Sequence, residues 1–430
     1  MKYAADAIRV RPEGKNYDDI RKTLHEKVIS GIDFSRQMSD AAVMELIDSE
    51  VIQYAGTNPI SLDDMRSVRQ DLYHSIRQLD VLQDLIEDPE ITEIMINGPD
   101  RVFIEKDGRI TRLDIRFSSA EKLEDVIQKI VADCNRVVNR SDPIADARLP
   151  GGERVSVVLP PVALDGPILT IRRFPPEPIT MKDLIRFGSI SKECALYLET
   201  MVKDGYNVFI SGGTGSGKTT FLNALSDAIP KTERIITIED NAELQIRHIP
   251  NLVRLEAREA SVDGCRRVSI RDLIRASLRM RPDRIIVGEV RGEEAIDMIQ
   301  AMNTGHDGSM STGHANTAAD MLARLETMIQ LGGLDLTPAA IRSQIASGID
   351  LVVHLGRLRD RSRKLLEISE IDGVLDGNIA LRTIYRFREE GEKDGRVIGG
   401  WVMENPPAHL QKLSMAGLHL PDSGICGVHS

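Results

Sequence analysis

Apolar residues recur at helical spacing between residues 17 and 76 of this 430-residue chain. Steps of three and four positions place such residues on one face of a helix. Three successive runs follow this rule, and they consist of Ile20, Leu24, Val28, Val43, Ile47, Val51, Leu62, Met65, Leu72 and Ile76. Ser61 with Asp64 three residues later is typical of a helix start. We therefore predict a helical N-terminal domain over residues 1–78, in which residues 1–16 form a loose leader.

Short strand-like runs and one amphipathic helix occupy the next stretch of the chain. Segments rich in β-branched residues stand at 94–97, 101–105, 110–113, 155–159 and 168–171, and residues 106–109 have the composition of a hairpin turn. Residues 121–134 carry apolar positions at helical spacing. This mixture predicts an α+β domain over residues 79–173.

A run of prolines then separates two patterns. Pro175, Pro176 and Pro178 stand so close together that neither a helix nor a central strand can contain them. We predict a linker over residues 174–180.

Beyond the linker, apolar strands alternate with helices. The strands are expected at 207–211, 234–238, 284–288 and 351–355, with helices at 219–227 and 269–280 and a late hairpin formed by 365–371 and 379–387. Nearly pure apolar strands alternating with helices predict an α/β domain with a mostly parallel sheet covered on both faces. We place this domain at residues 181–390. Residues 391–430 are treated as a tail without an assigned role.

Composition narrows the classes of function. The net charge of -11 lowers the expectation of nucleic-acid binding, which depends on neutralising phosphates with lysine and arginine. The four cysteines form no CxxC pair, so we expect reduced thiols and neither zinc nor a disulfide framework. The N-terminus resembles no signal peptide, and no apolar run is long enough to span a bilayer.

A phosphate-binding loop is the strongest chemical signal. Residues 212–219 match G-x-x-x-x-G-K-[ST] between a predicted strand and a predicted helix. Glycines let successive backbone N–H groups face one anion, and the following helix adds its positive end. The pattern predicts binding of ATP by Gly213, Thr214, Gly215, Ser216, Gly217, Lys218, Thr219 and Thr220. Lys218 is expected to reach the β- and γ-phosphates. The alternative is a glycine-rich turn without a ligand.

Acidic residues follow two of the predicted strands. Glu289 ends an apolar strand, and together with Thr219 it is expected to hold Mg²⁺. Glu239 and Glu243 follow another strand, where one of them could orient or deprotonate the attacking water. Residue chemistry alone does not rank these two acids. A charged loop without a catalytic role is the alternative.

Residues 305–316 concentrate glycine, serine, threonine and histidine. We predict a loop here in which His314 and Thr312 hydrogen-bond the γ-phosphate, although a lone histidine is more often structural. The spacing of His306 and His314, without a cysteine, is a poor metal motif.

Arginines step by four along the helix expected at 269–280. The stripe consists of Arg267, Arg271, Arg275 and Arg279. One interpretation is a solvated basic face. The other is a charged rim that reaches phosphates or acids of a neighbouring subunit, and for this reason Arg279 is included among the candidates for ATP binding.

The ordered motifs resemble those of the ATPases of type II and type IV secretion systems. The phosphate loop, the acidic segment 239–243, the strand ending at Glu289 and the histidine segment around His314 occur in the order found in that family. Residues 92–98 and 279–292 are especially similar to its CpaF-like subgroup, which assembles tight-adherence (Flp) pili. The resemblance covers roughly residues 80–390, and it identifies the α/β domain as a RecA-like P-loop NTPase domain.

The resemblance implies specific roles and partners. By position, Glu243 matches the family's catalytic glutamate, Glu289 its Walker B glutamate and His314 its His-box histidine. Arginines of the preceding domain often reach the nucleotide in this family, and here the candidates are Arg148, Arg154, Arg172 and Arg173. The family also implies a ring-shaped homohexamer with nucleotide between its two main domains. The four-cysteine zinc site of many pilus-extension relatives is missing here, so zinc is not expected.

We therefore expect a cytoplasmic motor, peripheral to the inner membrane, that uses Mg²⁺ and ATP to drive pilus assembly or protein secretion through an inner-membrane platform protein. ATP binding would close the α+β domain onto the RecA-like domain across the linker. A DNA-translocating ATPase, a nucleotide-dependent switch with little turnover and, more remotely, a small-molecule kinase are the alternatives.

Overall fold

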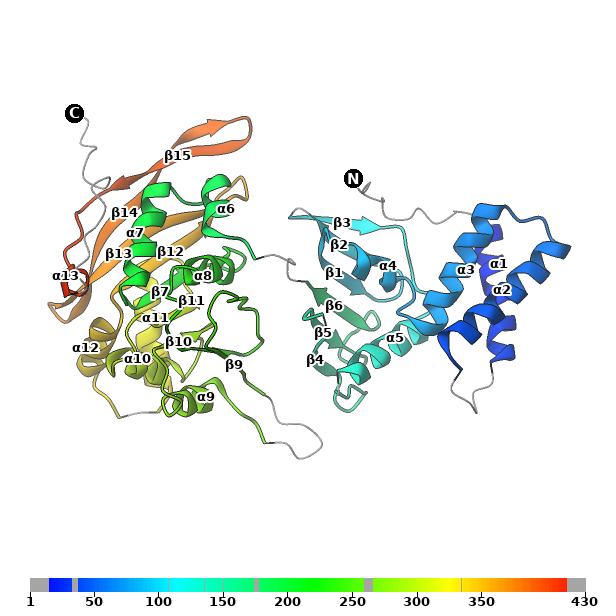
Figure 1. Ribbon diagram of the computed structural model, residues 1–430, viewed down its shortest axis with the longest axis horizontal. Helices are drawn as coiled ribbons and strands as arrows, with labels where there is room; N and C mark the ends of the chain where they lie inside the picture. Colours follow the sequence, from blue (N-terminus) through cyan, green and yellow to red (C-terminus); the bar gives the residue numbers. More distant parts are fainter. Residues whose placement is uncertain are drawn as a thin grey trace. The chain divides into compact units, whose positions relative to one another are not determined.

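The computed structural model describes residues 15–32, 38–106, 108–134, 136–149, 151–173, 178–258, 266–333 and 335–415 (Figure 1). The chain divides into two compact units, Met1–Pro176 and Glu177–Ser430. The division falls inside the proline run that was expected to be a linker, of which residues 174–177 lie outside the described part. Asp107 of the predicted hairpin turn, Cys265 and Cys426 lie outside it as well.

Helices form the first part of the first unit, as the apolar periodicity predicted. They are α1 (Lys15–Gly31), α2 (Asp40–Thr57), α3 (Leu62–Arg77) and the short α4 (Leu82–Glu87). Leu24, Val28, Val43 and Ile47 meet in the core of this bundle. The Ser61 hydroxyl accepts the backbone N–H of Asp64 at 3.0 Å, which confirms the predicted cap.

An antiparallel six-stranded sheet follows in the same unit, in the order β3-β2-β1-β6-β5-β4. Its strands are β1 (Ile91–Asn97), β2 (Val102–Lys106), β3 (Arg109–Leu113), β4 (Ile144–Arg148), β5 (Arg154–Val158) and β6 (Ile168–Arg172). Helix α5 (Ala120–Asp133) packs its apolar side on one face of the sheet. The prediction missed β4, whose alanines and aspartate have little intrinsic preference for strands.

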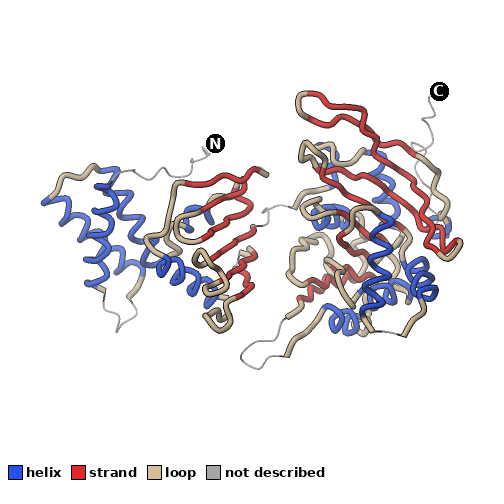
Figure 2. The backbone as a smooth tube through the Cα atoms, turned by 180° about the vertical axis from the view of Figure 1, so that it is seen from behind, coloured by secondary structure: helices blue, strands red, loops and turns tan. Residues whose placement is uncertain are grey.

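The second unit contains the expected parallel sheet. Figure 2, which colours strands red and helices blue, shows helices on both sides of it. The parallel strands are β7 (Val208–Gly212), β8 (Ile235–Glu239), β9 (Leu252–Glu256), β10 (Arg284–Val287), β11 (Met310–His314) and β12 (Leu351–Arg357). They lie in the order β12-β7-β11-β10-β8-β9. The α/β prediction is therefore confirmed.

Two helical layers cover this parallel sheet. One buried core joins it to α6 (Met181–Arg186), α7 (Lys192–Lys203) and α8 (Lys218–Ser226). The other joins it to α9 (Ile270–Ser277), α10 (Ala295–Asn303), α11 (Ala318–Leu331) and α12 (Pro338–Gly348). None of the described helices is both long and apolar enough to cross a membrane.

Strand β11 corrects the prediction of a loop at residues 305–316. It is buried between β7 and β10. Its polar side chains do not fit the apolar pattern expected of a buried strand. They can be buried because hydrogen bonds to the neighbouring backbone satisfy them. The Ser311 hydroxyl donates to the carbonyl oxygen of Val287 at 3.0 Å, and that of Thr312 donates to Gly288 at 2.7 Å.

Antiparallel strands extend the sheet beyond β12. They are β13 (Arg363–Leu375), β14 (Asn378–Lys393) and β15 (Arg396–Met403), and a short helix α13 (Gln411–Met415) follows. Figure 1 shows β14 and β15 as a long hairpin on this side of the sheet. The domain boundary expected at residue 390 falls within β14, so the strands carry the α/β domain into the predicted tail.

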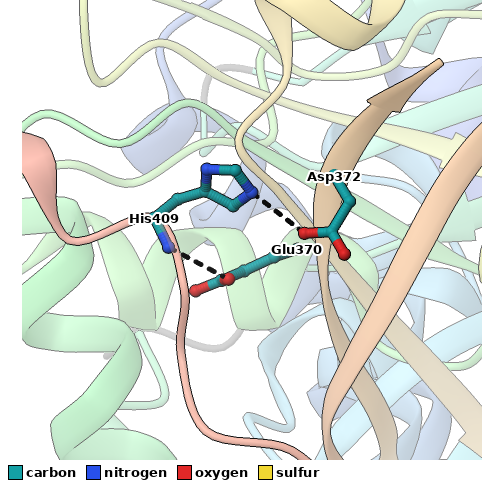
Figure 3. Close-up of side chains that lie close together, drawn as sticks. All are labelled: Glu370, Asp372 and His409. Carbon is teal, nitrogen blue, oxygen red and sulfur yellow. Dashed lines mark hydrogen bonds and ion pairs between the residues drawn. The ribbon is translucent and has the colours of Figure 1, made fainter.

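Glu370, Asp372 and His409 form a cluster that fastens this C-terminal segment (Figure 3). The buried Glu370 carboxylate accepts the hydroxyl of Tyr197 at 3.1 Å and the backbone N–H of Ala408 at 2.9 Å. Asp372 lies 3.0 Å from His409 Nε2 and accepts Nε of Arg382 at 2.9 Å. A metal ion would have to displace these donors. We therefore interpret the cluster as a clasp between β13 and the segment after β15.

Candidate active site

The carboxyl ends of four parallel strands bring the predicted phosphate and acid residues to one edge of the sheet. Gly212 ends β7 and pairs with His314, which ends β11. Glu289 stands two residues after β10, and Glu239 ends β8. In open α/β sheets, ligands bind at this edge. The structure thus assembles in one place residues that are spread over the sequence.

The phosphate loop has the backbone shape that anion binding needs. Gly215 and Gly217 have positive φ angles of 70° and 92°, a conformation that other residues rarely adopt. A Cβ atom added at Gly213 or Gly215 would meet open space, whereas one at Gly212 would lie 2.5 Å from the Leu355 carbonyl oxygen. The loop therefore packs closely against β12 at Gly212 and faces open space at Gly213 and Gly215.

The side chains around this loop fit a magnesium–triphosphate group. Thr219 and Thr220 belong to the first turn of α8, directly after Lys218. The buried Ser216 hydroxyl has no hydrogen-bond partner among the described residues. Hydroxyl and carboxylate oxygens are suitable magnesium ligands, and Thr219 and Glu289 offer one of each.

Lys218, His314 and Glu289 form a chain of polar contacts. The Lys218 ammonium donates to the carbonyl oxygens of Gly212 and Gly213 and lies 3.1 Å from His314 Nδ1. An ammonium can only donate, so Nδ1 accepts and Nε2 carries the proton. Nε2 lies 3.0 Å from Glu289 Oε1. His314 therefore links the phosphate-binding lysine to the acid expected to hold Mg²⁺.

Burial lowers the pKa values of Lys218 and His314. The side chain of Lys218 is only 7% exposed, and burial lowers its pKa while Glu289 opposes the shift. Burial, followed by the charge of Lys218, lowers the pKa of His314, which favours the neutral imidazole. The lysine has carbonyl and imidazole partners rather than a carboxylate, so its charge can still attract phosphate.

The structure separates the two acids that the sequence left unranked. Glu239 is 3% exposed, and its Oε1 accepts the backbone N–H groups of Glu243 and Leu244 at 2.8 and 2.9 Å. Its other oxygen, Oε2, is buried and has no partner among the described residues. Glu243 is only half-buried. Glu239 thus holds the turn that carries Glu243, and Asp240 ties this turn to the β10 side through an ion pair with Arg291.

Thr312 does not have the predicted role. Its hydroxyl is buried and donates to the Gly288 carbonyl oxygen, while its own carbonyl accepts the N–H of Val290 at 2.8 Å. Both bonds fix the segment that leads to Glu289. Of the two residues expected to bind the γ-phosphate, His314 alone has a side chain beside the phosphate loop.

Three arginines of the first unit form a row that the sequence did not reveal. In the strand ladder, Arg154 of β5 stands opposite Arg148 of β4 on one side and opposite Arg172 of β6 on the other. All three alternate with buried residues, so they share the sheet face opposite α5. Like charges directly opposite one another destabilise a sheet, and Glu93 of β1, opposite Arg172 on its other side, offsets part of this cost. Arg173 is not in the row, because its guanidinium donates to the carbonyl oxygens of Asp88 and Ile91.

Two arginines of the stripe form ion pairs within the fold instead of the proposed charged rim. Asp297 of α10 accepts Nε of Arg271 and Nε of Arg275, both at 2.8 Å. Arg279 lies just after α9, where the chain turns toward the amino end of β10. It is therefore at the opposite edge of the sheet from the phosphate loop of the same chain.

Glu239 should make stability depend on pH. Burial raises its pKa from 4.5 to about 7, so the folded state binds this proton more tightly than the unfolded chain does. Stability from this source is fully present below pH 4.5 and is lost as the pH rises through 7, a change of about 3 kcal/mol. Glu239→Gln keeps the Oε1 acceptor and removes the titration. We expect its stability relative to wild type to increase between pH 5 and pH 8.

Urea unfolding followed through Trp401, the single tryptophan, measures this difference in the second unit. Glu390→Gln, on the exposed part of β14, is the control. A difference between Glu239→Gln and wild type that stays constant across this range would contradict the assignment.

The chain is similar to known proteins over most of its length. A family model described as Type II/IV secretion system protein matches residues 76–391. A Mycobacterium tuberculosis protein named for conjugal transfer is 38% identical over 311 residues, which cover 71% of this chain and 87% of that protein. The Bordetella pertussis type IV secretion system protein PtlH is 33% identical over 321 residues, covering 69% of this chain and 95% of PtlH.

A solved structure supports the fold. The pilus retraction motor PilT with bound ADP is 20% identical, with a TM-score of 0.50, over 79% of this chain and 86% of PilT. The family match runs from residue 76 in the first unit to residue 391 in the second. The phosphate loop, His314, Glu289 and Glu239 lie together at one edge of the α/β sheet of the second unit. The chain is therefore an ATPase of the type II/IV secretion system family.

Proposed function

We propose that this chain hydrolyses ATP in a Mg²⁺-dependent reaction and that it works as a homohexameric motor for pilus assembly or protein secretion. The observation that carries the proposal is the contact chain from Lys218 through His314 to Glu289, next to the turn held by Glu239. The relatives named for conjugal transfer and type IV secretion support the transport role. Within the family, residues 92–98 and 279–292 favour the CpaF-like subgroup.

In this proposal, each residue has a distinct task. The loop N–H groups and Lys218 bind the β- and γ-phosphates and neutralise charge that develops in the transition state. Thr219 and Glu289 would hold Mg²⁺, which would draw electron density from the phosphate oxygens. Glu243 orients the attacking water and takes its proton. Glu239 is a positioning residue, since it binds the backbone of Glu243 rather than substrate.

The arginine row and the cellular setting complete the proposal. Arg148, Arg154 and Arg172 contribute to the binding of ATP, because guanidinium groups form charge-assisted hydrogen bonds with phosphates. ATP binding and hydrolysis drive a cycle of conformational change in each subunit. The hexamer acts in the cytoplasm, where an inner-membrane platform protein holds it at the membrane and receives the motion.

Lys218→Ala tests the site and the motor together. We expect steady-state ATP hydrolysis to fall at least about a hundredfold, because one donor to the transferred phosphate is removed. Wild-type activity should require Mg²⁺, elute at the size of a hexamer and remain unchanged when DNA is added. Lys231→Ala, an exposed lysine of the same unit, should keep wild-type activity. Activity in a monomer fraction, or strong stimulation by DNA, would contradict the hexameric secretion motor.

Glu243→Gln and Glu239→Gln form a matched pair that decides between the two acids. The glutamine amide in Glu243→Gln could not accept the proton from water, so we expect this variant to bind ATP normally and to lose about 10²–10⁴-fold in turnover. Glu239→Gln keeps an oxygen for the two backbone N–H groups and should retain most activity. Single-turnover hydrolysis alongside nucleotide binding measures both effects. The reverse result would make Glu239 the base.

Arg154→Ala tests the arginine row. Removing the central guanidinium should raise KM for ATP about tenfold, since a charge-assisted hydrogen bond is lost. Ser156→Ala, on the same face of the same strand, is the matched control. An unchanged KM for the arginine variant would exclude the row from nucleotide binding.

A further inference from the structure

The turn between β12 and β13 lies beside the phosphate loop. Leu355 of β12 pairs with Gly212 of β7, so the chain after Leu355 continues next to the loop that follows Gly212. On the return strand, Arg363 donates from Nε to the carbonyl oxygen of Gly215 at 3.0 Å. Its Cδ would also lie 3.5 Å from a Cβ atom placed at Gly217. A residue far along the chain thus contacts the centre of the phosphate loop.

Arg363 has a second arginine directly opposite it. Arg357, the last residue of β12, is its partner in the antiparallel ladder, and opposed residues of such a ladder point to the same face. Both side chains are exposed, and neither pairs with a carboxylate in the described part of the chain. Two opposed guanidinium groups repel each other, so the fold itself does not favour this pair.

Two other cations near this turn already have partners within the fold. Arg359 pairs with Glu389 and Glu392 of β14. Lys364 donates to the carbonyl oxygen of Gly188. Asp360 braces the turn, because it accepts the N–H of Ser362 at 2.9 Å and that of Val397 at 2.8 Å. The turn therefore holds Arg357 and Arg363 in place without neutralising them.

The order of the strands indicates which end of a nucleotide this pair meets. His314 and Glu289 lie on the β11 and β10 side of the phosphate loop, and the proposed function places the γ-phosphate and Mg²⁺ there. Strand β12 flanks β7 on the opposite side. A nucleotide that runs across the loop from its γ end therefore points its nucleoside toward Arg357 and Arg363.

We propose that Arg357 and Arg363 bind the nucleoside end of the nucleotide, as a second recognition element beside the phosphate loop. A planar guanidinium can stack on a base and donate hydrogen bonds to its acceptor atoms. This inference rests on the proposed binding of ATP at the phosphate loop. It assigns the pair a role in distinguishing a nucleotide from a bare polyphosphate.

Calorimetric binding of ADP and of inorganic tripolyphosphate to the full chain tests the proposal, because neither measurement requires turnover. We expect Arg363→Ala and Arg357→Ala each to raise the Kd for ADP about tenfold. Both variants should bind tripolyphosphate as wild type does, which also shows that they are folded. Arg363→Lys keeps the charge but not the planar fork, so it should recover part of the affinity. Arg361→Gly is the control, because Arg361 is exposed and its φ of 67° suits glycine.

Two results would overturn the inference. Unchanged ADP affinity in both alanine variants would remove the pair from nucleotide binding. Equal losses for ADP and tripolyphosphate would mean that Arg363 merely holds the phosphate loop in shape. In either case wild-type ADP binding would leave the proposed function standing, whereas a wild type that binds neither ligand would refute the proposed function together with this inference.

Discussion

The register of the parallel strand β7 determines where the phosphate loop lies relative to His314 and to the turn after β12. Gly212, at its carboxyl end, pairs with His314 on one side and with Leu355 on the other. The segments that leave three neighbouring strands therefore start at the same level of the sheet. A slip of one residue would turn each side chain of a strand to the opposite face. The contact between Lys218 and His314 exists because this register holds.

The same edge carries charged groups that the protein interior does not favour. Burial of an ionised side chain is costly unless partners replace the lost water. Lys218 receives carbonyl and imidazole partners, and Glu239 receives two backbone N–H groups on one oxygen alone. This incomplete compensation explains the raised pKa of Glu239 and the lowered pKa of Lys218. Such groups fit a site in which charge on a ligand completes the set of partners.

Sequence patterns predicted the parts of this protein that follow a local rule. The phosphate loop, the cap at Ser61 and the apolar strands β7, β8, β10 and β12 all carry their signal within a few residues. Strand β11 was missed because its hydroxyl groups are satisfied by β10, which lies elsewhere in the sequence. The arginine row depends on the pairing of three strands, and no spacing along the chain encodes it. The ranking of Glu239 and Glu243 likewise needed burial and hydrogen bonds.

The antiparallel extension gives the phosphate loop a further dependence on distant parts of the chain. Lys218 contacts a residue 96 positions away, and Gly215 contacts one 148 positions away. Arg363 belongs to a turn that Asp360 and Arg359 fasten to the β14–β15 hairpin. The clasp around Glu370 holds the segment after that hairpin to β13. The contact at the Gly215 carbonyl therefore forms only when these C-terminal strands have joined the sheet.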